Sequence, residues 1–177
     1  MERQTTTAAT LSRTRRSAYA VVLVATGVAL APYTSIPVGI AKINPTQHFI
    51  NVLAAVLLGP WWAAGIAGVV AVLRNAMGVG TLLAFPGGMI GALLAGLCYR
   101  YWPRSFTAAI GEVAGTGLIA PVVSALLVAP VLMERAIPLL ALVPSFLLSS
   151  LAGAVLGVLA LRLLEQADVI ELAGPSP

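Results

Sequence analysis

Charged side chains are scarce in this chain. Only 9% of its 177 residues are Asp, Glu, Lys or Arg, whereas 59% are hydrophobic and the mean hydropathy is +0.98. In a soluble domain of this length, about a quarter of the residues normally carry a charge. The composition therefore excludes an ordinary soluble protein and predicts an integral membrane protein. Long apolar stretches interrupted by Gly and Pro favour helices, so we expect an all-α membrane protein.

Cysteine and histidine are almost absent, with one residue of each type. A single cysteine, Cys98, cannot form a disulfide within the chain and excludes a metal site built on cysteines. The single histidine, His48, has no nucleophile at a recognisable spacing, so we expect no metal site, no catalytic residues and no enzyme activity. The glycines of Gly78-Val79-Gly80 are not followed by the Lys-Ser/Thr pair of a phosphate-binding loop. No nucleotide or other cofactor is therefore expected on this chain.

The apolar runs predict six transmembrane helices. Their expected bounds are 17–32, 45–58, 60–76, 82–101, 106–132 and 138–164. A basic N-terminal tail, residues 1–16, precedes this membrane domain of residues 17–164, and a tail of residues 165–177 follows it. The second and third helices are shorter than the ~20 residues that cross a bilayer, so they form either two short spans or one re-entrant hairpin. Trp61 and Trp62, beside the turn between them, favour two spans because Trp anchors helices at the membrane interface.

The basic residues predict the orientation in the membrane. Placing the N-terminus inside puts seven basic residues on the cytoplasmic side and three outside, in agreement with the positive charge that cytoplasmic segments carry. The seven are Arg3, Arg13, Arg15, Arg16, Arg100, Arg104 and Arg162, and the three are Lys42, Arg74 and Arg135. Both termini are therefore expected in the cytoplasm. This topology accounts for the net charge of +4 without a nucleic-acid partner.

The first apolar run has some features of a signal peptide, because three arginines precede it and it ends in Ala29-Leu30-Ala31. Pro32 directly after that triplet disfavours cleavage, so we expect a retained first helix. Residues 32–43 would then form a long outer loop, which is either a lid or a disordered link.

Small residues four positions apart lie on one face of a helix and allow a neighbouring helix to approach closely. Two such pairs interleave in the first helix, Ala25 with Ala29 and Gly27 with Ala31. We predict that Ala25 and Ala29 dock a partner membrane protein. The alternative is that this face packs inside the protein.

The start of the second helix concentrates hydrogen-bonding side chains in an otherwise apolar chain. Asn44 before Pro45, followed by Gln47, predicts a helix start with Asn as the N-cap, Pro at N1 and an amide at N3. Gln47, His48 and Asn51 then lie on one face of the helix. Polar side chains at membrane depth are costly and mark functional sites. The alternative is that these groups only cap the helix and bond to neighbouring helices.

Two ionisable residues lie further along the chain. Arg74 ends the third helix together with Asn75, and Glu112 lies ~10 Å inside the fifth helix if that helix starts near Ser105. A carboxylate at this depth needs a partner, and by charge we expect Arg74, in a pair that either binds ligand or is structural. A lone buried acid is also what proton coupling uses, so an ion-coupled carrier or channel with Glu112 as the coupling site stays open. An intramembrane enzyme with Glu112 or His48 as general base would lack a second catalytic group.

Several motifs together carry a family resemblance. They are Gln47-His48-Phe49-Ile50-Asn51, Leu57-Leu58-Gly59-Pro60-Trp61, Arg74-Asn75, Gly80-Thr81-Leu82-Leu83-Ala84-Phe85-Pro86-Gly87 and Gly111-Glu112-Val113-Ala114-Gly115-Thr116-Gly117. With these motifs the chain resembles the ThiW-type substrate-binding (S) components of energy-coupling-factor (ECF) transporters, most strongly over residues 40–120.

The resemblance implies a six-helix S component in the plasma membrane of a prokaryote. Such a subunit captures a thiamine precursor from outside, and hydroxyethylthiazole is the ligand we expect. The resemblance further implies docking on a transmembrane coupling subunit with two ATPase subunits, which hydrolyse ATP. Ala25 and Ala29 match the small-residue motif that such subunits use for docking.

A neutral heteroaromatic alcohol requires an apolar slot with a few polar groups that orient it. Phe49 and Phe85 are expected to stack on the ring, while His48, Asn51 and Asn75 are expected to bond its nitrogen or the hydroxyl. The complete set of predicted substrate-binding residues is Gln47, His48, Phe49, Asn51, Arg74, Asn75, Phe85, Glu112 and Thr116.

Overall fold

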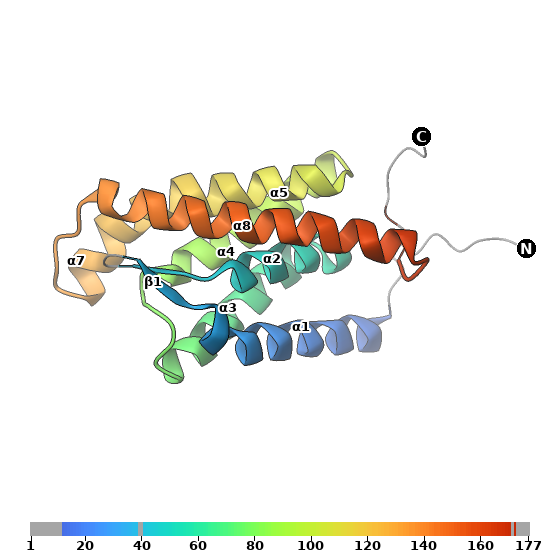
Figure 1. Ribbon diagram of the computed structural model, residues 1–177, viewed down its shortest axis with the longest axis horizontal. Coiled ribbons are helices and arrows are strands. Elements are labelled where there is room, and N and C mark those ends of the chain that lie inside the picture. Colours follow the sequence, from blue (N-terminus) through green and yellow to red (C-terminus); the bar gives the residue numbers. More distant parts are fainter. Residues whose placement is uncertain (1–11, 39–40, 171, 173–177) are drawn as a thin grey trace, which may run out of the picture.

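The protein forms a bundle of helices with a small β-hairpin at one end (Figure 1). This computed structural model describes residues 12–38, 41–170 and 172. The first residues of α1 and the last residues of α8 lie at the same end of the bundle, which we call the terminal end, and the hairpin lies at the opposite end, the hairpin end. In chain order the elements are α1 (Arg13–Thr34), β1 (Ile36–Val38), β2 (Ala41–Ile43), α2 (Pro45–Leu58), α3 (Pro60–Ala76), α4 (Ala84–Tyr101), a fifth helical stretch over Ser105–Leu132, and α8 (Leu139–Gln166).

α2 lies at the centre of the bundle. It packs against α1, α3, α4 and α8, and 11 of its 14 residues are buried. A helix that is mostly hydrophobic all round has to be covered on every side. Its start is as predicted, because the side chain of Asn44 accepts a hydrogen bond from the backbone N–H of Gln47 (2.9 Å) and Pro45 occupies the first turn. The predicted bounds of α2 and α3 are confirmed, and Gly59 between them has a φ of 91°, which favours glycine.

Small residues allow α4 to approach its neighbours closely. A Cβ added at Gly96 would lie 2.7 Å from the backbone nitrogen of Pro60, and one added at Gly91 would lie 2.8 Å from both carboxylate oxygens of Glu112. Larger side chains therefore do not fit at these two contacts. The small face of α4 holds α3 on one side and the helix that carries Glu112 on the other. The buried residues of α4 are Gly87, Gly88, Gly91, Ala92, Ala95 and Gly96.

The fifth helical stretch is not a regular α-helix. It consists of α5 (Ser105–Val113), a π-helical segment η1 (Ala114–Ile119), α6 (Ala120–Val123), a second π-helical segment η2 (Ser124–Val128) and α7 (Ala129–Leu132). Each π segment ends two residues before a proline, Pro121 or Pro130, which has no N–H for the preceding turn. The prediction of a helix over 106–132 is right in extent but missed these irregular turns. Single π turns are frequent at functional sites, and η1 contains Thr116.

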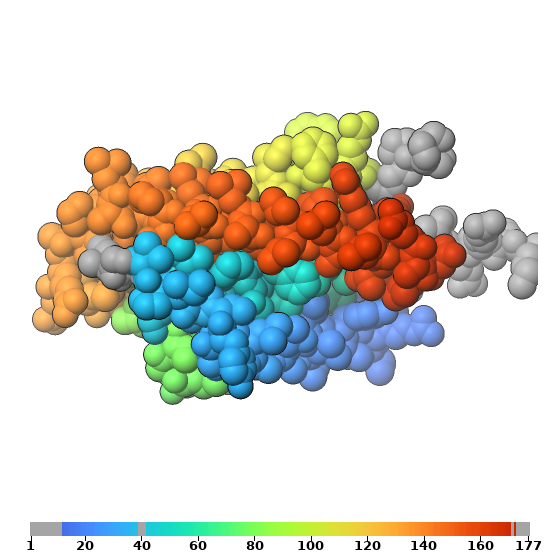
Figure 2. All heavy atoms as spheres, in the orientation of Figure 1, coloured from blue at the N-terminus to red at the C-terminus, as the bar shows by residue number. Residues whose placement is uncertain are grey.

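The described residues within 32–43 form regular structure, so the alternative prediction of a disordered link is wrong. α1 continues past Pro32, and β1 and β2 then pair antiparallel. Asn44 fixes the base of the hairpin: its backbone N–H donates to Ser149 Oγ (2.8 Å) and its Nδ2 donates to Ser35 Oγ (2.7 Å). The hairpin strands lie between the start of α8 and the end of α1 on the face shown in Figure 2. The segment therefore covers part of the hairpin end of the bundle.

Among the residues that the structure describes, three helices are long and apolar enough to cross a membrane by length and composition, namely α1, the stretch Ser105–Leu132 and α8. α2 is apolar but shorter. Large apolar side chains face outward on the long helices, with Leu126 74% and Leu140 83% exposed. An exposed apolar surface of this kind is typical of a membrane protein.

Candidate functional site

Polar side chains gather around a cavity at the hairpin end. The cavity has a volume of about 30 Å³, which is room for a water molecule but not for a ring compound. Its walls come from β2, α2, α3, the turn after α3, α4, η1 and α8, so a ligand there would touch most of the bundle. The polar lining residues are Lys42, Asn44, Gln47, His48, Arg74, Thr81, Thr116 and Ser149.

Glu112 lies beneath this cavity and is 0% exposed. Its Oε1 accepts hydrogen bonds from His48 Nδ1 (2.7 Å) and Asn51 Nδ2 (3.0 Å), and Thr116 Oγ1 lies 2.9 Å away. Opposite an ionised Glu112, His48 Nδ1 is the donor in this contact, because a carboxylate oxygen only accepts. His48 therefore has its other ring nitrogen, Nε2, left for a ligand.

A chain of two amides connects Glu112 to Arg74. Asn51 donates to Glu112 and accepts from Gln47 Nε2 (3.2 Å), and Gln47 Oε1 accepts from Arg74 Nη1 (3.2 Å). Arg74 Nη2 donates to Ser35 Oγ (3.4 Å). Glu112 and Arg74 lie at the two ends of this hydrogen-bonded series. They are the only charged groups in the series, and both are buried.

The predicted Arg74–Glu112 ion pair is wrong. Within the described residues, the contact of Glu112 at 2.7 Å is with His48, and Arg74 has no carboxylate within 4.0 Å. The reason is depth along the helices. Arg74 lies near the end of α3, whereas Glu112 lies well inside the fifth stretch, at the level of the second turn of α2.

Four of the predicted residues line the cavity, and two more lie directly beneath it. Asn51 and Glu112 are 0% exposed and support the lining side chains. The expectation that Gln47, His48 and Asn51 share one face is confirmed, because Gln47 and Asn51 bond to each other and His48 and Asn51 both bond to Glu112. The four lining residues are Gln47, His48, Arg74 and Thr116.

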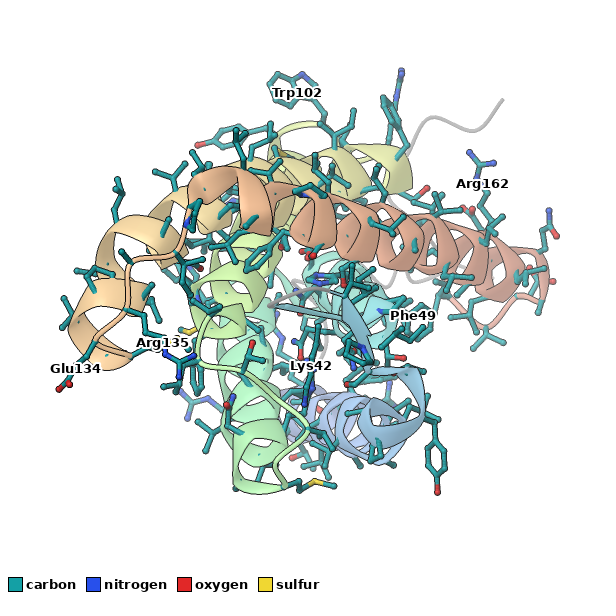
Figure 3. All side chains as sticks on the ribbon, turned by 60° about the vertical axis from the view of Figure 1, so that its left-hand side comes forward. Lys42, Phe49, Trp102, Glu134, Arg135 and Arg162 are labelled. Atoms are coloured by element: carbon teal, nitrogen blue, oxygen red, sulfur yellow. The ribbon has the colours of Figure 1, made fainter. Side chains whose placement is uncertain are left out.

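Three predicted residues lie away from the cavity lining. Phe49 packs against the main hydrophobic core and projects from α2 away from Lys42 (Figure 3). Asn75 Nδ2 donates to the carbonyl oxygens of Ala71 (2.8 Å) and Thr81 (3.5 Å), so it holds the turn after α3. Phe85 is partly buried and does not line the cavity.

Sequence reasoning did not assign five of the polar and aromatic lining residues. Lys42 donates from Nζ to the carbonyl oxygens of Gly78 (3.3 Å) and Val79 (3.2 Å), and it was visible in the sequence as a cation in an apolar chain. Asn44 was read only as a helix cap. Thr81, Phe146 and Ser149 come from a turn and from α8, and only the tertiary fold brings them to α2.

The two small-residue pairs of α1 face different surroundings. Gly27 and Ala31 are buried, and a Cβ added at Gly27 would lie 3.3 Å from Val70 on α3. Ala25 and Ala29 are exposed and line an apolar groove of about 750 Å³ between α1 and α3. Their exposure argues against the alternative that this face packs inside the protein, and docking of a partner stays a prediction.

An apolar helical bundle that buries a connected polar network beside a small cavity defines a membrane protein suited to binding a small molecule. The family model described as thiamine-precursor transporter protein (ThiW) matches residues 17–167, and the chain belongs to this family. Its role is therefore transport of a thiamine precursor across a membrane. Neither the curated proteins nor the solved structures gave a match.

Proposed function

We propose that the chain is the substrate-capture component of an ECF importer and that hydroxyethylthiazole is its ligand. The family supplies the substrate class, a thiamine precursor. The observation that carries the proposal is the buried network around the cavity, in which Glu112, Asn51 and Gln47 orient side chains that face the cavity. Burying such groups in an apolar bundle is costly, and they are retained where they serve a ligand.

Six crossings with both termini in the cytoplasm would place the cavity on the outer side. Arginines gather toward the terminal end and at the connection before α5, while Lys42, Arg74 and Arg135 belong to the hairpin end. This distribution follows the positive-inside rule. α2 has 14 residues and is therefore ~21 Å long. Because its neighbours cover it, α2 does not have to match the full thickness of the bilayer.

The cavity offers a ring compound both polar and aromatic contacts. We expect His48 Nε2 to accept from a hydroxyl of the ligand and Ser149 Oγ to donate to a ring nitrogen, with Thr116 beside them and Phe146 as an aromatic face. These groups surround a space of only about 30 Å³. We therefore expect the hairpin to move when a ligand binds. This movement would break the hydrogen bonds from Lys42 to the turn after α3.

Transport then requires a partner that uses ATP. The exposed Ala25–Ala29 face and the groove beside it supply a surface on which a helix of a coupling subunit can pack closely. We expect Ala29→Leu to abolish capture of the coupling and ATPase subunits while leaving ligand affinity unchanged. Ala141→Leu, at an exposed position on α8, is the matched control. Equal pull-down by both variants would remove α1 from the docking surface.

The binding test is calorimetry of hydroxyethylthiazole on the purified chain in lipid nanodiscs. His48→Ala should weaken binding several-fold, because a hydrogen bond to a neutral ligand contributes on the order of 1 kcal/mol. Tyr101→Ala removes a ring that is 74% exposed near the end of α4 and serves as the control. Unchanged affinity in His48→Ala, with measurable binding to the wild type, would reject the site.

The buried Glu112–His48 pair also supports a second candidate, an ion-coupled carrier. The two candidates differ in their energy source. Uptake that continues after the proton gradient is collapsed and that needs ATPase partners favours the ECF importer. Uptake that stops with the gradient and continues without those partners favours the carrier.

A further inference from the structure

Two cationic side chains line the cavity, and neither has an acidic partner among the described residues. Lys42 is partly buried and Arg74 is 4% exposed. In the described part of the chain, no carboxylate lies within 4.0 Å of either group. Lys42 donates to two backbone carbonyl oxygens, and Arg74 donates to the neutral oxygens of Gln47 and Ser35. Neutral acceptors satisfy hydrogen bonds, but they leave the charge uncompensated.

The acidic residues of the described chain do not supply the missing charge. Glu112 is engaged by His48. Glu134 is exposed just after α7, and its carboxylate points away from Lys42 in Figure 3. Glu165 and Asp168 lie at the end of α8, at the terminal end. The cavity wall and the layer beneath it therefore hold two full positive charges against one negative charge, before any proton is added to His48.

The guanidinium of Arg74 is also incompletely bonded. Its Nε is buried and has no hydrogen-bond acceptor among the described residues. A buried cation without a counter-ion is costly, and an unpaired buried donor adds to that cost. Arginine keeps its charge under all ordinary conditions, so it cannot lower this cost by losing a proton. The planar guanidinium is suited to bidentate bonding of phosphate or carboxylate oxygens.

We infer that an anionic group of the ligand, a phosphate monoester or a carboxylate, completes the cavity between Arg74 and Lys42. The heteroaromatic ring then lies toward His48 and Phe146, which line the same cavity. This inference rests on the proposed function: it keeps a thiazole precursor as the ligand class and makes an anionic derivative, in place of the neutral alcohol, the preferred ligand. Lys42 would exchange its carbonyl acceptors on the turn after α3 for the anion. The bound anion would thereby hold the hairpin through β2.

The test compares three ligands by calorimetry on the full chain in lipid nanodiscs: hydroxyethylthiazole, its phosphate monoester, and the corresponding thiazole carboxylic acid. We expect at least one anion to bind about tenfold or more tightly than the alcohol, the factor that a charge-assisted hydrogen bond supplies. The anion that binds more tightly shows whether the anionic group of the ligand is a phosphate monoester or a carboxylate. Inorganic phosphate should compete with the phosphate ester.

Charge-removing variants locate the anion. Arg74→Gln and Lys42→Gln should each remove most of the preference for the anion, measured as the ratio of the Kd of the alcohol to the Kd of the anion. Arg135→Gln, an exposed cation at the same end of the bundle, should keep the preference. Arg74→Lys keeps the positive charge and should therefore retain part of the preference for the anion. Helix content by circular dichroism checks that each variant is folded.

Each outcome bears on the inference. Equal affinity for alcohol and anions would overturn it and leave the proposed function standing. An anion preference that survives both Gln variants would also overturn it. If none of the three ligands binds, the proposed function fails. Thermal stabilisation by inorganic phosphate that is lost in Arg74→Gln would then still support an anion site, and its absence would reject one.

Discussion

Glu112 and Arg74 belong to one hydrogen-bonded chain, but their surroundings differ. Glu112 has three polar side chains around Oε1, including His48, and its Oε2 has no partner among the described residues. Arg74 has two neutral acceptors at 3.2 and 3.4 Å, and its Nε has no partner among the described residues. The difference separates two roles. Glu112 holds the network in place, whereas Arg74 is available to a ligand.

Removing Glu112 should have the largest effect on stability. Glu112→Ala leaves donors of His48 and Asn51 buried without an acceptor, and breaking a buried pair in this way costs about 3–5 kcal/mol. The measurement is the free energy of unfolding in a denaturing-detergent titration. A loss below about 1 kcal/mol would show that Glu112 does not hold the network, and the comparison with Arg74 would fail.

A larger side chain on α4 that presses against Glu112 should have the next largest effect on stability. A Cβ at Gly91 would lie 2.8 Å from both carboxylate oxygens, so Gly91→Ala should destabilise the protein by about 1–3 kcal/mol. Gly65→Ala on α3 is the control, because its Cβ would meet no atom within 4 Å. The same denaturation assay applies. Equal stability of the two variants would mean that α4 does not press on the carboxylate.

Double-mutant cycles sharpen the comparison further. The His48–Glu112 pair should show a coupling energy of about 1–3 kcal/mol, because the two groups are in direct contact at 2.7 Å. The Arg74–Glu112 pair should show a weaker coupling than the His48–Glu112 pair, because two amides separate the charges. Cycles with Glu112→Gln, His48→Asn and Arg74→Gln supply both values. A stronger coupling for Arg74 than for His48 would reverse the assignment.

The smallest effect is expected for Arg74→Gln in the absence of ligand. The variant loses hydrogen bonds to Gln47 and Ser35 but removes an uncompensated buried charge. These contributions oppose each other, so stability should change by less than about 1 kcal/mol. Detergent denaturation again gives the number. A loss comparable to that of Glu112→Ala would show that Arg74 is as structural as Glu112.

Local sequence signals predicted some elements well. The bounds of α2 and α3 are correct because Asn44-Pro45 and Gly59-Pro60 act on the backbone within one turn. The hairpin was missed because its strands have three residues each and one contains Pro37. The π turns of the fifth stretch were missed because a proline in a long apolar run predicts a break without specifying its form.

The part of the site that was predicted correctly also depends on local spacing along the sequence. Gln47, His48 and Asn51 share a face because helical spacing places them there. The partner of Glu112 was wrong because opposite charge was considered without depth along the helices. Phe146 and Ser149 were missed because they reach α2 from about a hundred residues further along the chain, as in the 105-residue separation of Asn44 and Ser149.

Native mass spectrometry of the purified protein tests the central claim, that the network around Glu112 builds a site for a thiamine precursor. The wild type, incubated with hydroxyethylthiazole and its phosphate monoester, should retain one thiazole compound per chain. His48→Ala should retain much less, and Tyr101→Ala should retain as much as the wild type. A protein that holds no thiazole compound, or a His48→Ala variant that holds it equally well, would contradict the account.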